Sequence, residues 1–273
     1  MVAKYKGSGT NLFKKIKYKS TALIQFSSNL FNSVNPLSNL VLIGTHHKTG
    51  TAWMQSIFHQ MALIYNVPVR TDELDITPTY GQVYLNGHSR FDFEVANKID
   101  YRGLHLIRDP RDIIVSACFY HQKSDEPWLH KKRSEFGGLT YQEKINSFLS
   151  VDDCILFEME GSAGGNIADI KNWCYENRHF IEVKYEDLIV DKQLLLFHQI
   201  FSFLGFHPCF VPKALEIAHN NSLFSKSSVV NNAHIRSGKP RQWENHFKAI
   251  HKDRFIELFG DILYWKQNEN RTF

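Results

Sequence analysis

The passage that decides the fold is NLVLIGTHHKTGTAW, residues Asn39–Trp53. It begins with a short apolar run, 40–43, of the kind that is buried on both faces of a parallel sheet. A loop with a lysine, hydroxyl side chains and two glycines follows, and then a segment whose apolar residues repeat at helical spacing as far as Ile64. A loop between a strand and a helix presents free backbone N–H groups and the positive end of the helix, which predicts an anion site.

The same alternation of an apolar run and a helix-like segment recurs along the chain. Apolar runs lie at 83–85, 104–107 and 180–183, and helix-like segments follow them at 91–99, 110–121 and 186–204. Strands that alternate with helices predict an α/β fold, here a single domain with a central parallel β-sheet flanked by helices. Ligands of such sheets bind at the carboxyl ends of the strands. We therefore expect the chemistry in the turns after Gly44, Leu85, Ile107 and Val183.

Charge is distributed unevenly over the 273 residues, which carry 32 basic and 28 acidic side chains and a net charge of +4. Residues 1–40 contain six lysines and neither an acid nor an arginine, so the rest of the chain carries a net charge of −2. The six are Lys4, Lys6, Lys14, Lys15, Lys17 and Lys19. We predict a basic N-terminal arm, 1–38, and one domain, 39–273. A mildly acidic body argues against a nucleic-acid partner, whose binding would need basic residues on the folded domain.

Targeting and redox signals are weak. No apolar run of about 7–15 residues follows the lysines, as a secretory signal requires, and no stretch approaches the roughly 20 apolar residues of a membrane span. The cysteines lie far apart without a C-x-x-C pair, which argues against a zinc ribbon and a disulfide framework; they are Cys118, Cys154, Cys174 and Cys209. We therefore predict buried thiols in a reducing compartment, a cytoplasmic protein and no stable membrane insertion.

The loop departs from the phosphate loop of nucleoside triphosphatases. The Walker pattern G-x-x-x-x-G-K-[ST] has its lysine directly after the second glycine, whereas Lys48 here precedes Gly50. A P-loop kinase-like phosphotransferase is therefore an alternative only. Taken alone, the loop could also be an ordinary α/β turn that binds nothing.

Residues Lys48–Trp53, KTGTAW, resemble the K-[ST]-G-T-[TS]-W loop of sulfotransferases that use 3′-phosphoadenosine 5′-phosphosulfate (PAPS). Residues 106–116, LIRDPRDIIVS, are similar to the R-[ND]-P-[KR]-D-x-x-V-S element of that family, with the same number of residues between the arginine and the serine. Two further passages support the resemblance. Residues 184–188 (KYEDL), followed by FLG at 203–205, look like its Y-E-D-L and F-L-G passage.

The fourth passage, 236–247 (RSGKPRQWENHF), matches the R-K-G-x-x-G-D-W-K-N-x-F signature at its Arg, Gly, Trp, Asn and Phe. It departs from the signature at Ser237, which replaces a lysine, and at Arg241 and Gln242, which replace glycine and aspartate. The four elements come in the family's order and span about residues 40–260. The chain is thus similar to the family over most of its length.

The resemblance implies a sulfotransferase fold, PAPS as the sulfuryl donor and no required metal. It implies that Lys48 stabilises charge on the leaving phosphate, which is electrostatic catalysis. It assigns binding of PAPS to three groups of residues. The phosphosulfate loop comprises Lys48, Thr49, Gly50, Thr51, Ala52 and Trp53. The group around the 3′-phosphate comprises Arg108, Ser116, Arg236, Ser237 and Gly238, and the group around the adenine comprises Trp53, Tyr185 and Ser222.

Sulfuryl transfer also needs a base, because the acceptor's proton must leave as the new bond forms. Histidine suits this task at neutral pH, and the resemblance places the catalytic histidine at His88. The alternatives are a nearby carboxylate, Asp92 or Glu94, and then His46 or His47 beside the loop. As a metal pair, the two adjacent histidines would need further ligands that the sequence does not indicate.

The acceptor pocket of the family is built from variable loops, here 66–82, 122–140 and 150–166. Their acids could attract a cationic acceptor or simply form a solvated face; they are Asp72, Glu73, Asp75, Asp152, Asp153, Glu158 and Glu160. By family analogy we predict small-molecule sulfation at a hydroxyl or at an amine or guanidinium nitrogen. The acceptor classes we consider are a natural product or alkaloid of secondary metabolism, a phenol and a steroid alcohol.

Two further predictions concern assembly and activity. The family's dimer motif K-x-x-x-T-V-x-x-x-E falls on Glu244, Lys248, Ala249 and Asp253, so we expect a monomer or a non-standard dimer. The rival function is a catalytically inactive regulatory protein that binds PAPS or its product 3′-phosphoadenosine 5′-phosphate (PAP), with the basic arm docked on lipid or RNA. The presence of both Lys48 and His88 argues against it.

Overall fold

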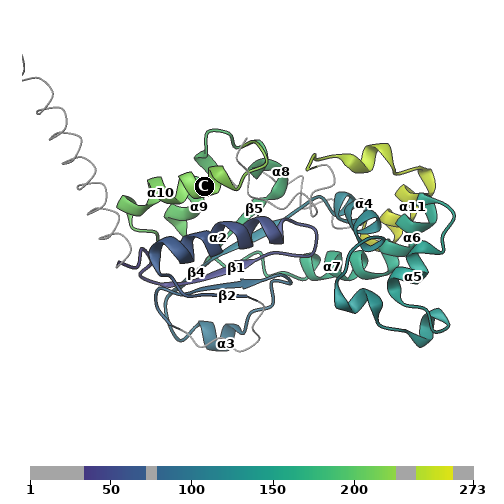
Figure 1. The fold of residues 1–273 in the computed structure, drawn as a ribbon, viewed down its shortest axis with the longest axis horizontal. Coiled ribbons are helices and arrows are strands. Elements are labelled where there is room, and N and C mark those ends of the chain that lie inside the picture. Colours follow the sequence, from purple (N-terminus) through teal and green to yellow (C-terminus); the bar gives the residue numbers. More distant parts are fainter. Residues whose placement is uncertain (1–33, 72–78, 226–237, 261–273) are drawn as a thin grey trace, which may run out of the picture.

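Five parallel strands form one sheet within residues 34–71, 79–225 and 238–260, the part of the chain that the computed structural model describes (Figure 1). They are β1 (Leu40–Gly44), β2 (Val69–Thr71), β3 (Val83–Asn86), β4 (Tyr101–Ile107) and β5 (Phe180–Lys184). Their order is β2-β3-β1-β4-β5. Strands β2 and β3 lie on one side of β1, and β4 and β5 lie on the other. The carboxyl end of β1 is therefore the switch point at which such sheets bind ligands. The predicted α/β fold is confirmed.

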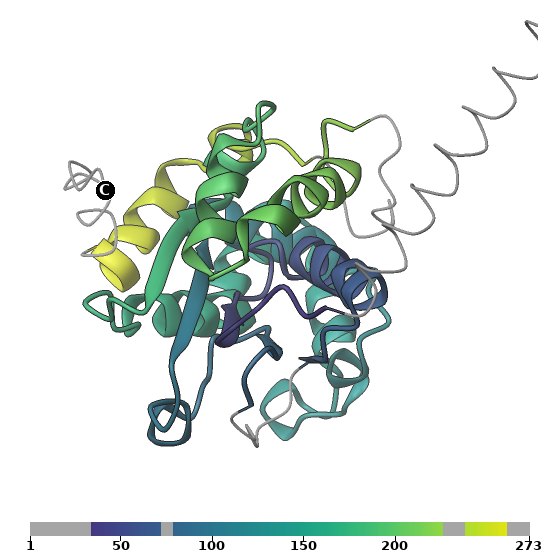
Figure 2. The same cartoon turned by 90° about the vertical axis from the view of Figure 1, so that its left-hand side faces the viewer.

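Helices cover both faces of the sheet (Figures 1 and 2). On one face, apolar residues of β1 pack with α2 (Thr51–Tyr65), α8 (Tyr185–Leu188), α9 (Leu195–Phe203) and α10 (Val211–Asn220). On the opposite face lies α3 (Phe93–Ala96). The others are α4 (Pro110–His121), α5 (Tyr141–Asn146), α6 (Val151–Glu160), α7 (Ser162–Lys171) and α11 (Ala249–Phe259). Short 3-10 helices lie at Pro127–His130, Ser134–Phe136, Pro208–Phe210 and Gln242–Asn245.

Strand β1 is buried on both faces, as its uninterrupted apolar run predicts. Val41 and Ile43 belong to the cluster under α2. Leu40 and Leu42 belong to the cluster on the opposite face. Side chains of a strand alternate between faces, so each of its four apolar residues has a core to enter.

A separate apolar cluster joins α4, α6, α7 and α11 at one end of the molecule (Figure 1). Ile113 of α4, Ile155 of α6, Ile167 of α7 and Phe255 of α11 are all buried in it. Helix α4 begins three residues after β4 ends, with Pro110 at its first position. This cluster therefore forms a wall next to the carboxyl ends of the strands.

The helix predicted over 186–204 is interrupted. The structure has α8, then a break, then α9. The Asp191 carboxylate accepts hydrogen bonds from three backbone N–H groups at the start of α9, and Leu194 takes a left-handed conformation with φ 59°. An aspartate that satisfies the free donors of a helix start favours a new helix over a continuous one.

Two other element predictions need adjustment. Edge strand β2 was not predicted, because three half-exposed residues carry no apolar alternation. The helix-like segment 91–99 contains only the four-residue α3, whose N-cap is Asp92. By contrast, α4 has the predicted bounds, 110–121.

The prediction of four buried thiols is wrong. Cys118 of α4 and Cys154 of α6 form a disulfide, while Cys174 and Cys209 are exposed free thiols. The spacing of 36 residues does not reveal the pair, because two helices that are distant in sequence bring the sulfurs together. The prediction of a reducing compartment rested on four buried thiols and therefore loses that support.

The predicted arm lies outside the described residues except for 34–38. There Leu37 is buried and pairs with Phe206, and the Asn35 amide donates to the Gly81 carbonyl. Among the helices that the structure describes, none has the length and apolar content needed to cross a membrane.

Candidate active site

The loop between β1 and α2 is closed by its own side chains. The Thr49 hydroxyl donates to the His46 carbonyl at 2.8 Å and accepts from the His46 N–H at 2.9 Å. Gly50 has φ 119°, a conformation that side-chain-bearing residues rarely adopt, and a Cβ there would lie 3.2 Å from the Leu106 side chain. Glycine is therefore required for the sharp entry into α2.

The start of α2 offers free donors. Gly50 is its N-cap and supplies no side-chain hydrogen bond. Within the described residues, the backbone N–H groups of Gly50, Thr51 and Ala52 have no acceptor. Such a helix start attracts anions through its N–H groups and its dipole.

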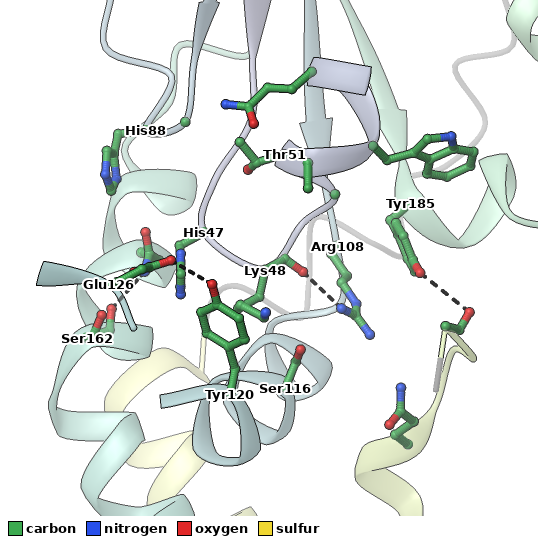
Figure 3. Close-up of a pocket in the computed structure, with 18 of the residues that line it drawn as sticks. His47, Lys48, Thr51, His88, Arg108, Ser116, Tyr120, Glu126, Ser162 and Tyr185 are labelled. Carbon is green, nitrogen blue, oxygen red and sulfur yellow. Dashed lines mark hydrogen bonds between the residues drawn. The ribbon is translucent and has the colours of Figure 1, made fainter. Parts of the chain in front are cut away.

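A cavity of about 460 Å³ opens over this loop (Figure 3). It brings together most of the residues that the sequence predicted: Lys48, Gly50, Thr51, Ala52, Trp53, His88, Arg108, Ser116, Tyr185 and Gly238. Its other lining residues are His47, Gln55, Gly87, Tyr120, Glu126, Trp128, Ser162, Asn166, Leu223 and Gln242. Segments far apart in sequence thus meet at the switch point of the sheet.

Arg108 is a buried cation held from several sides. Its Nη1 donates to the Lys48 carbonyl at 2.9 Å, and its Nη2 lies 3.9 Å from the Asp112 carboxylate. Its guanidinium lies 4.6 Å from the centroid of the Tyr185 ring. Its Nε is buried and has no hydrogen-bond partner among the described residues. A buried charged donor with an unsatisfied N–H is suited to an anion, which would supply the missing acceptor.

Lys48 lies at the floor of the cavity with φ 69°. Its Nζ is 3.4 Å from the centroid of the Tyr120 ring. Burial and the neighbouring Arg108 lower its pKa to about 7, against a smaller opposing effect of Glu126. A second negative group near Nζ would restore the full charge of this lysine.

Trp53 and Tyr185 stand edge to face at one side of the cavity, 6.1 Å between ring centroids. Both are nearly buried, and the Tyr185 hydroxyl donates to the Gly238 carbonyl at 3.4 Å. The indole N–H of Trp53 is buried without a partner among the described residues. The two rings form an aromatic wall that a flat base can contact.

His88 follows β3 in a turn that Asn86 organises. The Asn86 side chain accepts from the backbone N–H groups of His88 and Arg90, both at 3.0 Å. The exposed ring of His88 lines the cavity, and no hydrogen bond joins that ring to another residue in the described part of the chain. Neither carboxylate alternative, Asp92 or Glu94, lines the cavity.

His47, which also lines the cavity, begins a hydrogen-bonded series that we term the cavity chain. His47 Nε2 lies 3.0 Å from His121 Nε2, and His121 Nδ1 lies 2.6 Å from Glu158 Oε1. The two imidazoles are stacked at 13°. His121 and Glu158 are fully buried.

His46 begins a second series, which we term the buried chain. His46 Nε2 lies 2.8 Å from His105 Nε2, and His105 Nδ1 lies 2.5 Å from Glu182 Oε2. Glu182 also accepts from the Trp173 indole at 2.8 Å. None of its three members lines the cavity. Burial lowers the pKa of His46 to about 2 and that of His105 to about 3, and raises that of Glu182 to about 8.

Several predicted residues lie elsewhere. Thr49 and Ser222 are buried and do not line the cavity; the Ser222 hydroxyl donates to the His219 carbonyl. Arg236 and Ser237 lie outside the described residues, as do the acids at 72, 73 and 75.

The remaining predicted acids do not reach the cavity. Asp152 pairs with Lys248 and Glu160 with Arg254, both on the side of α11. Glu158 is a member of the cavity chain. Asp153 lies in the first turn of α6 and accepts from the Ser150 hydroxyl. The acid that lines the cavity is instead Glu126, which the sequence did not single out.

The sequence reasoning also missed Tyr120, His121 and the aromatic Trp128. One signal was available: Tyr120 follows Ser116 by four residues on α4 and so shares its face. Glu126 accepts from the Tyr120 hydroxyl at 2.9 Å and from the Trp128 indole at 2.6 Å. No such spacing connects His121 with Glu158. In the described ranges, no cluster of His, Cys, Asp and Glu could hold a metal ion.

The family model of the sulfotransferase domain matches residues 95–267. The chain belongs to the sulfotransferase domain family. This sulfotransferase has no significant match among curated proteins. Among solved structures, the mouse sulfotransferase SULT7A1 complexed with PAP is similar, with a TM-score of 0.53 and 15% identity over 85% of this chain and 87% of that one. At this identity the likeness is one of fold.

Proposed function

We propose that this sulfotransferase moves the sulfuryl group of PAPS to a hydroxyl or nitrogen of a small-molecule acceptor. The observation that carries the proposal is the convergence of Lys48, Arg108, Ser116 and the free N–H groups of α2 in one cavity. These donors come from a loop, the end of a strand and the middle of a helix. A body with few excess charges can bind a polyanion through such placed groups.

The donor set of the cavity fits PAPS. The unsatisfied Arg108 Nε and the free N–H groups at 50–52 are donors that need anionic acceptors. Arg108, Ser116 and Gly238 would hold the 3′-phosphate, with Trp53 and Tyr185 beside the adenine. The loop Lys48–Ala52 would hold the phosphosulfate. Bound PAPS supplies a sulfuryl group on a phosphate leaving group.

Lys48 would stabilise the negative charge that grows on the leaving phosphate. Its pKa is lowered because the partly desolvated cation has little negative charge nearby, so an anion beside Nζ favours the protonated form. Charge stabilisation by a prepositioned donor is strong because the donor does not have to reorient as the charge develops. The lysine is held over Tyr120 before any ligand arrives.

Of the residues that the structure describes, two histidines line the cavity and are candidates for the base: His88, as the sequence predicted, and His47. At the same end lie Glu126, Tyr120 and Trp128, a carboxylate with two aromatic rings. A carboxylate beside aromatic rings suits an amine or guanidinium acceptor, because charge pairing and cation–π contact act together. This supports a cationic natural product as the acceptor class. Neutral phenols and alcohols are the acceptors with which its rate of sulfation is to be compared.

The experiment incubates the protein with ³⁵S-labelled PAPS and a panel of guanidines, amines, phenols and alcohols. We expect transfer of label with one PAP released per product, and loss of transfer in Lys48→Ala. Lys213→Ala, which changes an exposed lysine paired with Glu216 on α10, is the matched control and keeps the wild-type rate. Tight PAP binding without transfer to any acceptor would instead support the regulatory-protein alternative. Normal transfer by Lys48→Ala would refute the role of this lysine.

A further inference from the structure

The cavity chain connects the loop between β1 and α2 to the buried interior through two hydrogen bonds. His47 lies directly before Lys48, His121 is the last residue of α4, and Glu158 is on α6. The Cys118–Cys154 disulfide joins the same two helices less than two turns away from His121 and Glu158. The positions of both inner members are thus set by packing and a covalent link rather than by solvent.

The hydrogen-bond directions in this chain follow from its buried end. Glu158 accepts from His121 through Oε1 and from the Ala163 N–H through Oε2, at 2.6 and 3.2 Å. Ala163 is in the first turn of α7, where the helix dipole favours negative charge. An ionised Glu158 requires the proton of His121 on Nδ1. Nε2 of His121 is then an acceptor, and the facing Nε2 of His47 must donate.

His47 is thereby held in one tautomer. Its Nε2 carries the proton that His121 accepts, so Nδ1 carries the lone pair. Among the described residues, Nδ1 has no hydrogen-bond partner, and the ring lines the cavity beside Lys48. His88 lines the same cavity, but no residue in the described part of the chain fixes its ring by a hydrogen bond. A base oriented by a second group and a carboxylate is the arrangement that activates nucleophiles in other enzyme classes.

We propose that His47 is the catalytic base of the sulfuryl transfer and that His121 and Glu158 are its positioning residues. This inference rests on the proposed function. The acceptor oxygen or nitrogen forms its bond to sulfur and gives its proton to Nδ1 of His47. The bond between sulfur and the phosphate oxygen breaks, and its electron pair stays on the phosphate next to Lys48. The positive charge on His47 is then shared through His121 toward Glu158.

The state of the ring agrees with this role. Burial, with the neighbouring His121, Lys48 and His88, lowers the pKa of His47 well below its ordinary value. The ring is therefore neutral at pH 7, so Nδ1 is unprotonated before the acceptor binds. The proton it gains passes to the solvent or the product when the ligands leave.

The test compares four variants with the wild type: His47→Gln, His88→Gln, Glu158→Gln and Glu182→Gln. The last is the matched control, because it makes the same change in the buried chain, which does not line the cavity. Transfer is measured with ³⁵S-labelled PAPS and PAP binding by calorimetry. The histidine tautomers are read from ¹⁵N chemical shifts of the labelled protein without ligand.

We expect His47→Gln to lower the transfer rate by roughly 10²–10⁴-fold and Glu158→Gln by roughly tenfold or more. Neither should change the Kd for PAP, and Glu182→Gln should change neither quantity. The loss in both cavity-chain variants should be larger for aliphatic alcohols than for phenols that are ionised at the assay pH, because an ionised acceptor has no proton to give. The NMR spectra should show His47 protonated on Nε2 and bare on Nδ1.

Two results would overturn the inference while leaving the proposed function intact: a wild-type rate in His47→Gln with loss of transfer in His88→Gln, or a His47 ring protonated on Nδ1. Failure of the proposed function looks different, since the wild type itself would then transfer no label to any acceptor, whether or not it binds PAP.

Discussion

The two histidines that precede Lys48 each start a His–His–Glu series, but only one of the two series reaches the cavity. His47 leads through His121 to Glu158 and lines the cavity. His46 leads through His105 to Glu182 and is enclosed beneath the loop. Glu158 accepts from a helix N-terminus, whereas the pKa of Glu182 is raised to about 8 by burial.

A histidine–glutamate pair thus acquires its role from its surroundings. A carboxylate that stays ionised gives the outer histidine a free lone pair, and a carboxylate that is protonated does not. In the buried chain, a protonated Glu182 donates to His105, so that His46 carries its proton on Nδ1, an atom that is buried without a partner among the described residues. The His46 carbonyl accepts from the Thr49 and Thr51 hydroxyls, so His46 contributes to the loop through its backbone.

The largest effect should come from Lys48, which directly follows the two histidines and lines the cavity. Lys48→Met keeps the length of the side chain and removes its charge. We expect the transfer rate to fall by roughly 10²–10³-fold, as when one prepositioned charge-stabilising donor is lost. Single-turnover kinetics with saturating PAPS measures this. A fall in affinity for PAPS with an unchanged rate at saturation would show that Lys48 only binds the donor.

The disulfide should matter for stability and, of the two chains, only for the cavity chain. Replacing both Cys118 and Cys154 by Ala removes a link between α4 and α6. We expect the free energy of unfolding in urea to drop by about 2–4 kcal/mol. The ¹⁵N shifts of His121 should move while those of His105 stay in place. Equal movement of both histidines would show that the link stabilises the fold without favouring the cavity chain.

The buried chain should make stability depend on pH. Glu182 has an ordinary pKa of 4.5 in the unfolded chain and about 8 in the native state. Its contribution is therefore complete below pH 4.5 and is lost as the pH rises through 8, by at most about 1.4 kcal/mol per pH unit. Glu182→Gln, which resembles the protonated acid, should flatten the decline of Tm between pH 5 and 8. An unchanged slope in this variant would contradict a protonated Glu182.

PAP binding should take up a proton at Lys48, which belongs to neither chain. The pKa of about 7 in the free protein should rise when an anion binds, so affinity should fall above pH 7 by up to about tenfold per pH unit. Calorimetry at pH 8 in buffers of different ionisation enthalpy measures the proton uptake. No buffer dependence in the wild type, or the same uptake in Lys48→Met, would assign the proton elsewhere.

The sequence predicted the parts of the site that are local. The strand, loop and helix around Lys48, the position of Arg108 after a strand and the bounds of α4 all follow from apolar spacing, glycine and proline. These features depend on residues within a few positions of one another. The motif resemblance added Ser116, Tyr185 and Gly238, which the fold brings to the same cavity.

The cavity chain could not be predicted, for a physical reason. His121 and Glu158 sit 37 residues apart on helices whose apolar faces predict only burial. Their contact depends on how α4 and α6 cross, and no local spacing records that. The same holds for Cys118 and Cys154, which the wide spacing suggested were separate thiols.

The role of the cavity as a PAPS site is tested by the binding of PAP, measured by isothermal calorimetry in wild type, Arg108→Met and Arg102→Met. Both arginines belong to the β4 region, but Arg102 lies at the amino end of the strand, paired with Asp100, and Arg108 lies in the cavity. We expect one PAP per chain, a loss of about 10–100-fold in affinity for Arg108→Met and no loss for Arg102→Met. Equal affinities in all three proteins, or no binding by the wild type, would refute a donor site at Arg108.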